Sequence, residues 1–274
     1  MTTWHAGLYV VATPIGNLGD LSPRAAETLK RAAVVAAEDT RTSGALVRGT
    51  GSQARMVSLT EHNVDERIPQ LLPVAREGVL ALISDAGTPA IADPGARLVA
   101  AAHAGGVPVF AVPGPSALAA ALSVSGFDGP DAHFLGFLPR QKGERTRSLQ
   151  AAAAVATILV FFESPNRLAA TLAELAALHG DPEVVVCREL TKLHEEVVRG
   201  RASALTERFQ SARGECAVVV RVAPGEARAA ATREMEDLIG AMKRAGARRS
   251  PAAAEVARIT GCRREDAYAA WERA

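Results

Sequence analysis

Short, continuously apolar segments alternate with stretches of helical periodicity through the first half of the chain, and this alternation limits the fold most strongly. The apolar segments, which we interpret as strands, span residues 7–12, 33–37, 57–59, 79–83 and 107–112. Strands without polar alternation are typical of a parallel sheet, because helices cover both of its faces. We expect those helices over residues 24–31, 64–77 and 95–104, the first preceded by the capping pair Ser22-Pro23. The pattern therefore predicts an α/β domain with a parallel sheet.

Polar, glycine and proline residues follow each of these predicted strands directly. The segments concerned are residues 13–21, 38–41, 61–63, 84–89 and 113–116. In open α/β sheets the carboxyl ends of the parallel strands meet at one edge, and ligands bind there. The sequence thus predicts a ligand site at this edge of the sheet.

The second half of the chain has a different pattern. We expect strands over residues 134–139, 157–162, 183–187, 195–199 and 215–222, and helices at 166–178 and 202–208. Hairpin-like spacing around residues 188–199 favours a mixed or mostly antiparallel sheet. We therefore expect two α/β domains, residues 1–115 and 116–223, with their boundary near Pro115.

A third part, residues 224–274, is predicted to be a small helical appendage. Residues 224–228 have the composition of a linker. A helix is expected from Ser250-Pro251 to Ile259, and Gly261-Cys262 separates it from a second helix that ends near Trp271. Two helices joined by a glycine turn have the outline of a helix-turn-helix, but a packing appendage is the better interpretation than a nucleic-acid contact.

Charge and composition limit the partners of the chain. The 274 residues include 31 Lys and Arg against 30 Asp and Glu, so a polyanionic partner would have to be bound by local basic patches. Aromatic residues make up only 4%, which argues against a surface that stacks many unpaired bases. No leader opens the sequence and its apolar runs are too short to span a bilayer, so we expect a soluble, cytoplasmic protein without a membrane partner.

Cysteine and histidine residues give no catalytic or metal-binding pattern. The three cysteines are far apart and are interpreted as small buried hydrophobic residues, while the six histidines are dispersed, so no metal is expected. A hydrolase with a Ser–His–acid triad is disfavoured because the sequence contains no GxSxG turn.

Several spaced motifs occur together and in order. They are residues 13–20 (TPIGNLGD), 38–41 (EDTR), 61–63 (EHN), 84–89 (SDAGTP) with 93–95 (DPG), 112–116 (VPGPS), 134–139 (FLGFLP) and 162–165 (FESP). In this combination the chain resembles the ribosomal RNA small subunit methyltransferase I family of the tetrapyrrole-methylase-like superfamily. The resemblance covers Leu8 to about Val222, and the helical tail also fits it.

This resemblance implies a fold and an activity that composition and periodicity do not give. The fold is two α/β domains of the tetrapyrrole methylase type, with a parallel first sheet and a mixed second sheet. The activity is S-adenosylmethionine-dependent methylation of the 2′-hydroxyl of a cytidine ribose in the decoding region of 16S rRNA. The implied partners are the small ribosomal subunit and a second copy of the chain, in a homodimer.

By the same resemblance, a cleft between the two domains holds S-adenosylmethionine. The glycine and alanine residues of two turns would let main-chain groups reach this ligand. The cofactor-binding residues expected on this basis are Pro14, Asp85, Ala86, Gly87, Thr88, Pro113, Ser116, Ala117, Leu138 and Phe162. The alternative is that these turns are ordinary loops of an α/β fold.

Methyl transfer to a ribose hydroxyl is helped by a base that takes up the hydroxyl proton. The candidates at the predicted sheet edge are Glu38, Asp39, His62 and Asp85, with Arg41 and Asn63 as orienting or phosphate-binding groups. An acid–arginine pair that stiffens the loop is the alternative for residues 38–41, and a loop hydrogen bond is the alternative for His62. The sequence does not choose among these candidates.

Two groups of basic residues are candidates for RNA phosphate contacts. The densest group is Arg140, Lys142, Arg145 and Arg147, which we expect on a loop directly after a strand of the site. The second is Arg248, Arg249, Arg263 and Arg264 in the tail. A solvated surface is the alternative for both groups.

Three other functions remain open alternatives. The first is methylation of a tetrapyrrole or a protein by an enzyme of the same superfamily. The second is a noncatalytic RNA-binding module in ribosome assembly. The third is a nicotinamide oxidoreductase, since the loop at residues 16–20 is rich in glycine and acidic residues follow the next strand, although the loop lacks the GxGxxG pattern.

Overall fold

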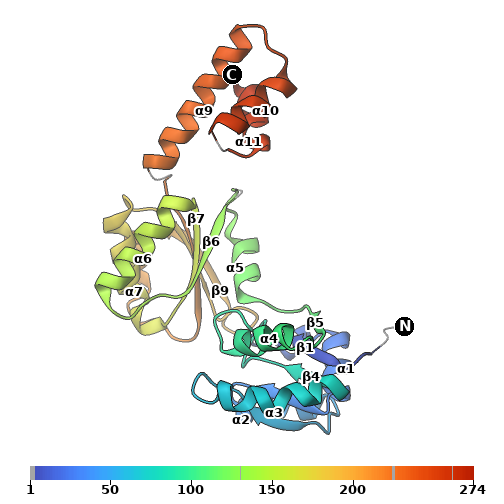
Figure 1. Ribbon diagram of the computed structural model, residues 1–274. Coiled ribbons are helices and arrows are strands. Elements are labelled where there is room, and N and C mark those ends of the chain that lie inside the picture. The colour runs from blue at the N-terminus through green and yellow to red at the C-terminus, as the bar shows by residue number, and fades with distance from the viewer. Residues whose placement is uncertain (1–3, 130, 224–225, 261) are drawn as a thin grey trace.

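Two five-stranded sheets follow one another along the molecule, and a helical module stands beyond the second sheet (Figure 1). This arrangement is seen in a computed structural model that describes residues 4–129, 131–223, 226–260 and 262–274. The first sheet has the order β3-β2-β4-β1-β5, and all of its strand pairs are parallel, as the sequence predicts. Its strands are β1 (Gly7–Val11), β2 (Val34–Ala37), β3 (Arg55–Ser58), β4 (Val79–Leu82) and β5 (Val109–Val112).

Helices cover both faces of this first sheet. They are α1 (Pro23–Arg31), α2 (Thr40–Gly49), α3 (Val64–Glu77) and α4 (Gly95–Ala104). Apolar residues of α1 and α2 pack on one face, around Val11 and Val35, while those of α3 and α4 pack on the other, around Leu8 and Ala36. Neighbouring strand residues point to opposite faces, so both faces need apolar side chains and the strands are continuously apolar.

The sequence pattern does not predict helix α2, which begins in the 38–41 motif. Asp39 caps its first turn by accepting a hydrogen bond from the Arg41 backbone N–H at 2.8 Å. Only Ser43, Gly44 and Val47 of this helix are buried, so its apolar stripe is too thin to stand out in the sequence. The sequence predicts a loop at residues 38–41, but in the structure this motif begins a helix.

The second sheet is mixed, as expected, with the order β6-β7-β10-β8-β9. β6 and β7 are parallel, and the other pairs are antiparallel. One face is covered by α5 (Ala117–Ser125) and the other by α6 (Lys142–Val155), α7 (Pro165–Leu178) and α8 (Ala202–Arg208) (Figure 1). The strands are β6 (Ala132–Phe137), β7 (Ile158–Glu163), β8 (Glu183–Arg188), β9 (Glu196–Arg201) and β10 (Cys216–Arg221).

The helical module contains one more helix than the sequence predicts. Pro224 and Gly225 of the expected linker lie outside the described residues, but the helix α9 (Glu226–Arg244) begins immediately after them, so the linker prediction is wrong for residues 226–228. The two expected helices are α10 (Arg249–Thr260) and α11 (Arg264–Arg273), and Gly261 between them is also outside the described residues. The three helices share a small core that includes Ile239 and Val256.

Candidate active site

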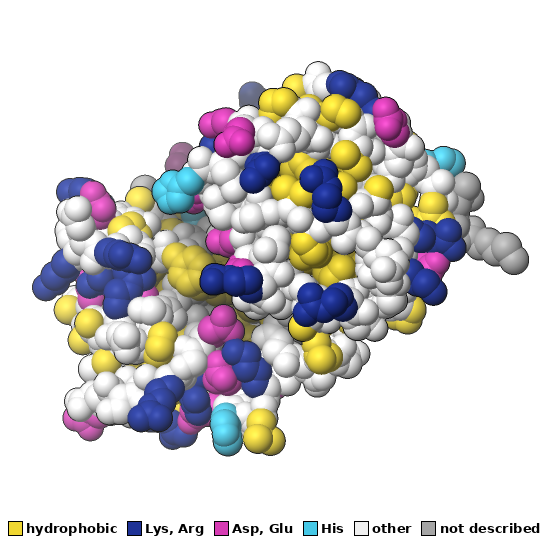
Figure 2. Space-filling model, turned by 90° about the horizontal axis from the view of Figure 1, so that it is seen from below, with side chains coloured by type: hydrophobic (Ala, Val, Ile, Leu, Met, Phe, Trp, Pro, Cys, Tyr) yellow, Lys and Arg dark blue, Asp and Glu magenta, His cyan; other side chains and the backbone are white. Residues whose placement is uncertain are grey.

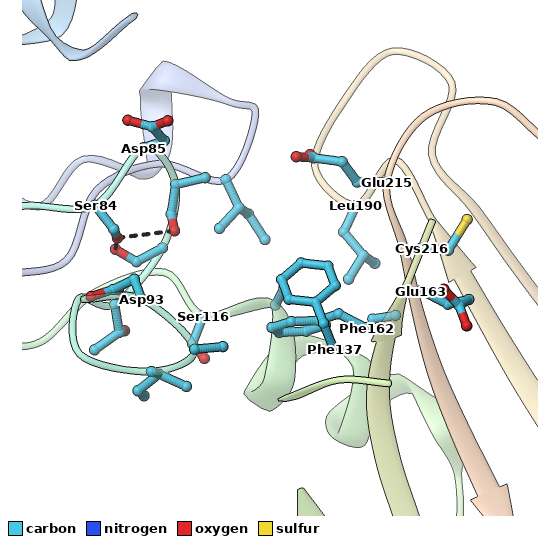
Figure 3. A pocket seen from close by; sticks show the side chains of 18 of the residues that line it. Ser84, Asp85, Asp93, Ser116, Phe137, Phe162, Glu163, Leu190, Glu215 and Cys216 are labelled. Carbon is cyan, nitrogen blue, oxygen red and sulfur yellow. Dashed lines mark hydrogen bonds between the residues drawn. The ribbon is translucent and has the colours of Figure 1, made fainter. Parts of the chain in front are cut away.

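A cavity of about 420 Å³ lies where the two sheets meet. Figure 3 shows residues of the first sheet's loops on one side and residues of the second sheet on the other. From the first sheet come Ile15, Glu38, residues 84–88 and residues 91–93, and the start of α5 adds Ser116 and Ala117. From the second sheet come Phe137, residues 162–165, Cys187, Leu190 and residues 214–217.

The loop after β4 is held in place by backbone pairing. Gly87 and Thr13 form an antiparallel bridge, with N–H to carbonyl distances of 2.9 and 3.1 Å. The Thr88 hydroxyl donates to the Pro115 carbonyl at 3.1 Å, which ties this loop to the loop before α5. The bridge requires a left-handed backbone at Gly87, where φ is +80°, so this position favours glycine.

The second part of this loop is shaped by Asp93. Its carboxylate accepts the backbone N–H groups of Ala90 at 2.9 Å and Gly95 at 2.8 Å. Ala90 and Ala92 both have φ of +66°, a conformation that is unfavourable for residues with a Cβ. Ile91 lies between them and is 39% exposed at the cavity. The loop thus stores backbone strain in order to hold an apolar side chain at the cavity.

Of the predicted bases, Glu38 and Asp85 line the cavity. The pKa of Glu38 is raised above its ordinary value of 4.5, first by burial and then by the negative charges of neighbours that include Asp85 and Asp93. Asp85 accepts a hydrogen bond from the Asp39 backbone N–H at 3.0 Å, which joins the ends of β2 and β4. Although Glu38 is an exposed residue, partial burial of its carboxyl and its acidic neighbours make it take up a proton more readily than a glutamate that stands alone.

Asp39 is occupied by other contacts. Besides capping α2, its carboxylate binds the Arg41 guanidinium at 2.9 and 3.1 Å. These bonds lower the pKa of Asp39 to about 2. The Arg41 side chain is 90% exposed and does not line the cavity. The structure thus agrees with the alternative of an acid–arginine pair for Asp39 and Arg41, here at the start of a helix.

The 61–63 motif also lies outside the cavity lining. His62 is exposed on the turn before α3. Asn63 shapes that turn: its side-chain oxygen accepts the Thr60 N–H at 2.8 Å and its amide donates to the Ser58 carbonyl at 3.3 Å. Asn63 is thus explained by a local structural role.

In the second sheet, a buried carboxylate fixes the ends of two strands. Glu163 accepts hydrogen bonds from the Thr171 hydroxyl and the Ser164 N–H, both at 2.8 Å, and forms an ion pair with Arg167 at 2.5 Å. The same guanidinium donates to the Leu138 carbonyl at 3.1 Å. The end of β7 and the end of β6 are therefore held together from beneath the cavity.

The two cysteines at the cavity are buried and are not paired in a disulfide. Burial raises the pKa of the Cys187 thiol to about 12 and that of Cys216 to about 11. At neutral pH both side chains are therefore neutral thiols rather than nucleophilic thiolates. Within the described residues, no group of three or more His, Cys, Asp or Glu side chains is placed to hold a metal ion.

The cavity brings together most of the expected cofactor-binding residues. Those that line it are Asp85, Ala86, Gly87, Thr88, Ser116, Ala117 and Phe162. Pro14 and Pro113 are not among the lining residues, and Leu138 is 2% exposed in the core beneath α6 and α7. Leu138 follows the last residue of β6, and its side chain is buried among apolar residues of α6 and α7 rather than at the cavity, so its contact with the cofactor stays a prediction.

Sequence reasoning missed several residues of the second sheet. Phe137, Glu163 and the segment 214–217 line the cavity but were not predicted. For Phe137 and Glu163 a signal existed, because both stand inside motifs at predicted strand ends. Residues 214–217 lie at the beginning of β10, and no signal at strand ends could have found them.

The expected basic loop at residues 140–147 is largely the first turns of α6. Arg140, Lys142 and Arg147 are exposed, but Arg145 is 7% exposed and forms an ion pair with Glu174 at 2.7 Å. The prediction of an RNA contact is wrong for Arg145, because its guanidinium is buried against Glu174 and packs α6 on α7. On the face shown in Figure 2, lysine and arginine side chains are interspersed with acidic ones and form no single basic patch.

Most tail arginines of the second basic group are also paired with neighbours. Arg249 contacts Glu272, and Arg263 contacts Asp266 at 3.0 Å. Arg264 donates to Ser250 at 3.2 Å and lies near the Tyr268 ring. These contacts support the interpretation of the tail as a packed helical module. In the part of the chain that the structure describes, no helix is long and apolar enough to cross a membrane.

Comparisons with known proteins show which family the chain belongs to. The model of the family Tetrapyrrole (Corrin/Porphyrin) Methylases matches residues 7–206. A ribosomal RNA small subunit methyltransferase I from Micromonospora olivasterospora is 47% identical over 85% of this chain and 77% of its own length. The protein of that name from Mesorhizobium japonicum is 44% identical over 95% of this chain and 90% of its own length.

Solved structures share the fold at lower identity. Uroporphyrin-III C-methyl transferase from Thermus thermophilus, complexed with S-adenyl homocysteine, has a TM-score of 0.57 at 21% identity and covers 78% of this chain and 97% of that one. A diphthine synthase has a TM-score of 0.61 at 17% identity, covering 78% and 89%. From these matches and the cavity between its two sheets, the chain belongs to the tetrapyrrole methylase family and, within it, to the ribosomal RNA small subunit methyltransferase I group.

Proposed function

We propose that this methyltransferase transfers a methyl group from S-adenosylmethionine to the 2′-hydroxyl of a cytidine ribose in the decoding region of 16S rRNA. Relatives named ribosomal RNA small subunit methyltransferase I, 39–47% identical to this chain, support the methyl transfer and the RNA substrate. The observation that carries the choice of a hydroxyl acceptor is Glu38, an exposed glutamate of raised pKa that lines the cavity.

The cavity fits S-adenosylmethionine in size and chemistry. Its volume of about 420 Å³ lies in the range of small-molecule sites. Ala86, Gly87 and Ala117 leave the backbone accessible, and a Cβ at Gly87 would come within 3.3 Å of the Ile15 Cγ2. The carboxylates of Asp85 and Asp93 suit a ligand that carries a positive sulfonium. When bound, this cofactor supplies an electrophilic methyl group.

We propose that the Glu38 carboxylate takes up the proton of the acceptor hydroxyl. A base works best when its pKa lies near the pH of the reaction, and burial together with acidic neighbours moves the Glu38 pKa upward in that direction. Asp39 is a weaker base, because its contacts with Arg41 lower its pKa to about 2. His62 lies outside the cavity. The ordered loops around the cavity would align the hydroxyl for in-line attack.

The exposed basic residues near the cavity are proposed to bind RNA phosphates. Arg140 and Lys142 follow β6 directly, and Phe137 at the end of β6 lines the cavity. Lys142 is the first residue of α6, and Arg147 lies further along this helix. An RNA strand whose nucleotide enters the cavity would thus pass these side chains, which position the backbone without reading its sequence. The homodimer stays a prediction, to be checked by light scattering of the purified protein.

A labelling experiment tests this function. Small ribosomal subunits from cells that lack the gene are incubated with the purified protein and methyl-labelled S-adenosylmethionine. We expect label in 16S rRNA, in a dinucleotide that resists alkaline hydrolysis, because a 2′-O-methyl group blocks cleavage at that ribose, and in 2′-O-methylcytidine after complete digestion. Label in a base, in a ribosomal protein, or only in a porphyrin-type acceptor would contradict the proposal, and Glu38→Gln serves as the inactive control.

A further inference from the structure

Phe137 has an unusual position for a large apolar residue. Its side chain is 63% exposed, although it lines the cavity at the junction of the two sheets. The ring packs edge-on against Phe162, with 5.5 Å between centroids, and Phe162 in turn packs against Phe134 at 5.1 Å. Figure 3 shows the Phe137 and Phe162 rings together in the space between the two groups of lining residues. Phe137 is thus the exposed member of an ordered aromatic cluster.

The backbone of β6 is distorted where it presents this ring. The register of β6 against β7 shifts between Phe134 and Phe137, and Gly136 between them has φ of +63°. Such irregularities re-aim a side chain and are frequent next to active sites. The fold therefore interrupts a regular strand in order to turn Phe137 toward the cavity.

The strained loop of the first sheet meets this bulge. A Cβ at Gly136 would lie 3.8 Å from the Cβ of Ala92, so the two segments are in contact. Ile91 precedes Ala92 and is itself 39% exposed at the cavity. Two backbone distortions, one from each sheet, thus hold an aromatic and an aliphatic side chain partly in solvent. Strain of this kind is typical of ligand clamps.

We propose that Phe137 is a substrate-binding residue on which the base of the acceptor nucleotide stacks, with Ile91 contacting it from the first sheet. This inference rests on the proposed function, since a ribose that reaches Glu38 brings its base into the mouth of the cavity. Unpaired bases of RNA are commonly bound by stacking on aromatic rings. A single ring suffices for one extruded nucleotide, which agrees with a chain whose aromatic content is only 4%.

Three variants separate stacking from other roles of the ring. Phe137→Ala removes it, Phe137→Leu keeps apolar volume without an aromatic face, and Phe137→Trp keeps an aromatic face. Val124→Ala is the matched control, because Val124 is 47% exposed but does not line the cavity. For each variant, kcat and KM for unmethylated small subunits are measured, together with the Kd of S-adenosylmethionine by calorimetry and the melting temperature.

The expected result is a selective loss of RNA affinity. Phe137→Ala and Phe137→Leu should raise KM for small subunits by roughly 5- to 150-fold, the effect of losing one stacked base. Phe137→Trp and Val124→Ala should stay close to wild type, and the Kd of S-adenosylmethionine should not change in any variant. All four proteins should melt like wild type, because the altered side chains are exposed.

Two results would overturn the inference. If Phe137→Leu binds small subunits as well as Phe137→Trp does, the aromatic face has no role. If the Kd of S-adenosylmethionine rises by the same factor as KM, the ring belongs to the cofactor site instead. A wild-type protein that methylates no small subunit would refute the proposed function itself, so the two failures are distinguishable.

Discussion

The two sheets contribute different chemistry to one cavity. The first, parallel sheet supplies carboxylates, namely Glu38, Asp85 and Asp93, on loops at the ends of its strands. The second, mixed sheet supplies mainly apolar groups, including Phe137 and Phe162, and its two carboxylates at the cavity, Glu163 and Glu215, are paired with Arg167 and Lys192. The contrast suggests a division of labour in which the first sheet takes up the proton and the second sheet holds the substrate. Variants on each side should then change different kinetic constants.

The largest effect is expected for Glu38→Gln. Loss of the base should lower the single-turnover rate about 10²- to 10⁴-fold with little change in small-subunit binding. The matched control is Asp39→Asn, one residue away, which should keep most of the rate because Asp39 caps α2 and pairs with Arg41. A Glu38→Gln enzyme with a near-wild-type rate would remove the proton-accepting role from the first sheet.

The pH dependence of the rate should follow the protonation of the Glu38 carboxyl group. Its pKa is raised above 4.5, and the proposed base is its carboxylate form, so the single-turnover rate should fall as pH drops through this raised pKa. Stability should respond with the opposite sign, since a raised pKa in the folded state favours folding at low pH and loses that contribution as pH rises through it. A rate profile that is unchanged by Glu38→Gln would contradict this assignment.

The next effect concerns the loop after β4. Gly87→Val places a side chain within 3.3 Å of Ile15 at a backbone φ of +80°, so it should weaken S-adenosylmethionine binding about tenfold or more, equivalent to about 1.4 kcal/mol. Gly51→Val is the control, because Gly51 has φ of +78° but nothing within 4 Å of an added Cβ. Calorimetry should show normal cofactor affinity for Gly51→Val. If both variants lost cofactor affinity equally, backbone strain alone would explain the loss.

On the second-sheet side, Glu163→Gln should change folding stability and leave the proton transfer unchanged. The change leaves the Arg167 guanidinium without its charged partner and should destabilise the fold by about 1–3 kcal/mol, toward the low end because the Arg167 side chain is 25% exposed. Denaturant unfolding measures this loss. The pH at which the rate falls should stay as in wild type, and a shifted profile would mean that the second sheet takes part in the proton transfer.

The smallest effect is expected from the exposed basic residues. Replacing Arg140, Lys142 and Arg147 by glutamine should flatten the dependence of small-subunit binding on salt by about 0.7 in log–log slope per lost phosphate contact. Arg145→Met is the contrast, since Arg145 is buried against Glu174 and should change stability rather than the salt slope. An unchanged slope in the triple variant would exclude this surface as the phosphate contact.

The difference between the sheets also explains what the sequence could predict. In the parallel sheet every strand ends at the same edge, so residues after the strands, such as Glu38 and Asp85, could be assigned to one site from strand ends alone. In the second sheet β10 runs antiparallel to β7, and Cys216 at the start of β10 pairs with Glu163 at the end of β7. On this side the cavity is therefore lined both by residues at strand ends and by residues at strand starts. Residues 214–217 are at a strand start, so a search of strand ends does not find them.

Other parts of the site depend on tertiary contacts that no spacing encodes. Arg145 belongs to a basic run in the sequence, but only the packing of α6 on α7 shows that it is buried against Glu174. Phe137 stands in a predicted strand, and only the bulge at Gly136 turns its ring to the cavity. Asp39 and Glu38 are neighbours with the same chemistry in sequence, and helix α2 separates their roles.

Mapping 2′-O-methylation across 16S rRNA in cells tests the central claim most directly. Three strains are compared: one with the wild-type gene, one without it, and one with Glu38→Gln expressed at the same level. The account predicts that one cytidine ribose in the decoding region loses its methyl group when the gene is absent, and that the wild-type gene but not Glu38→Gln restores it. A methylation map that is identical in all three strains would contradict it.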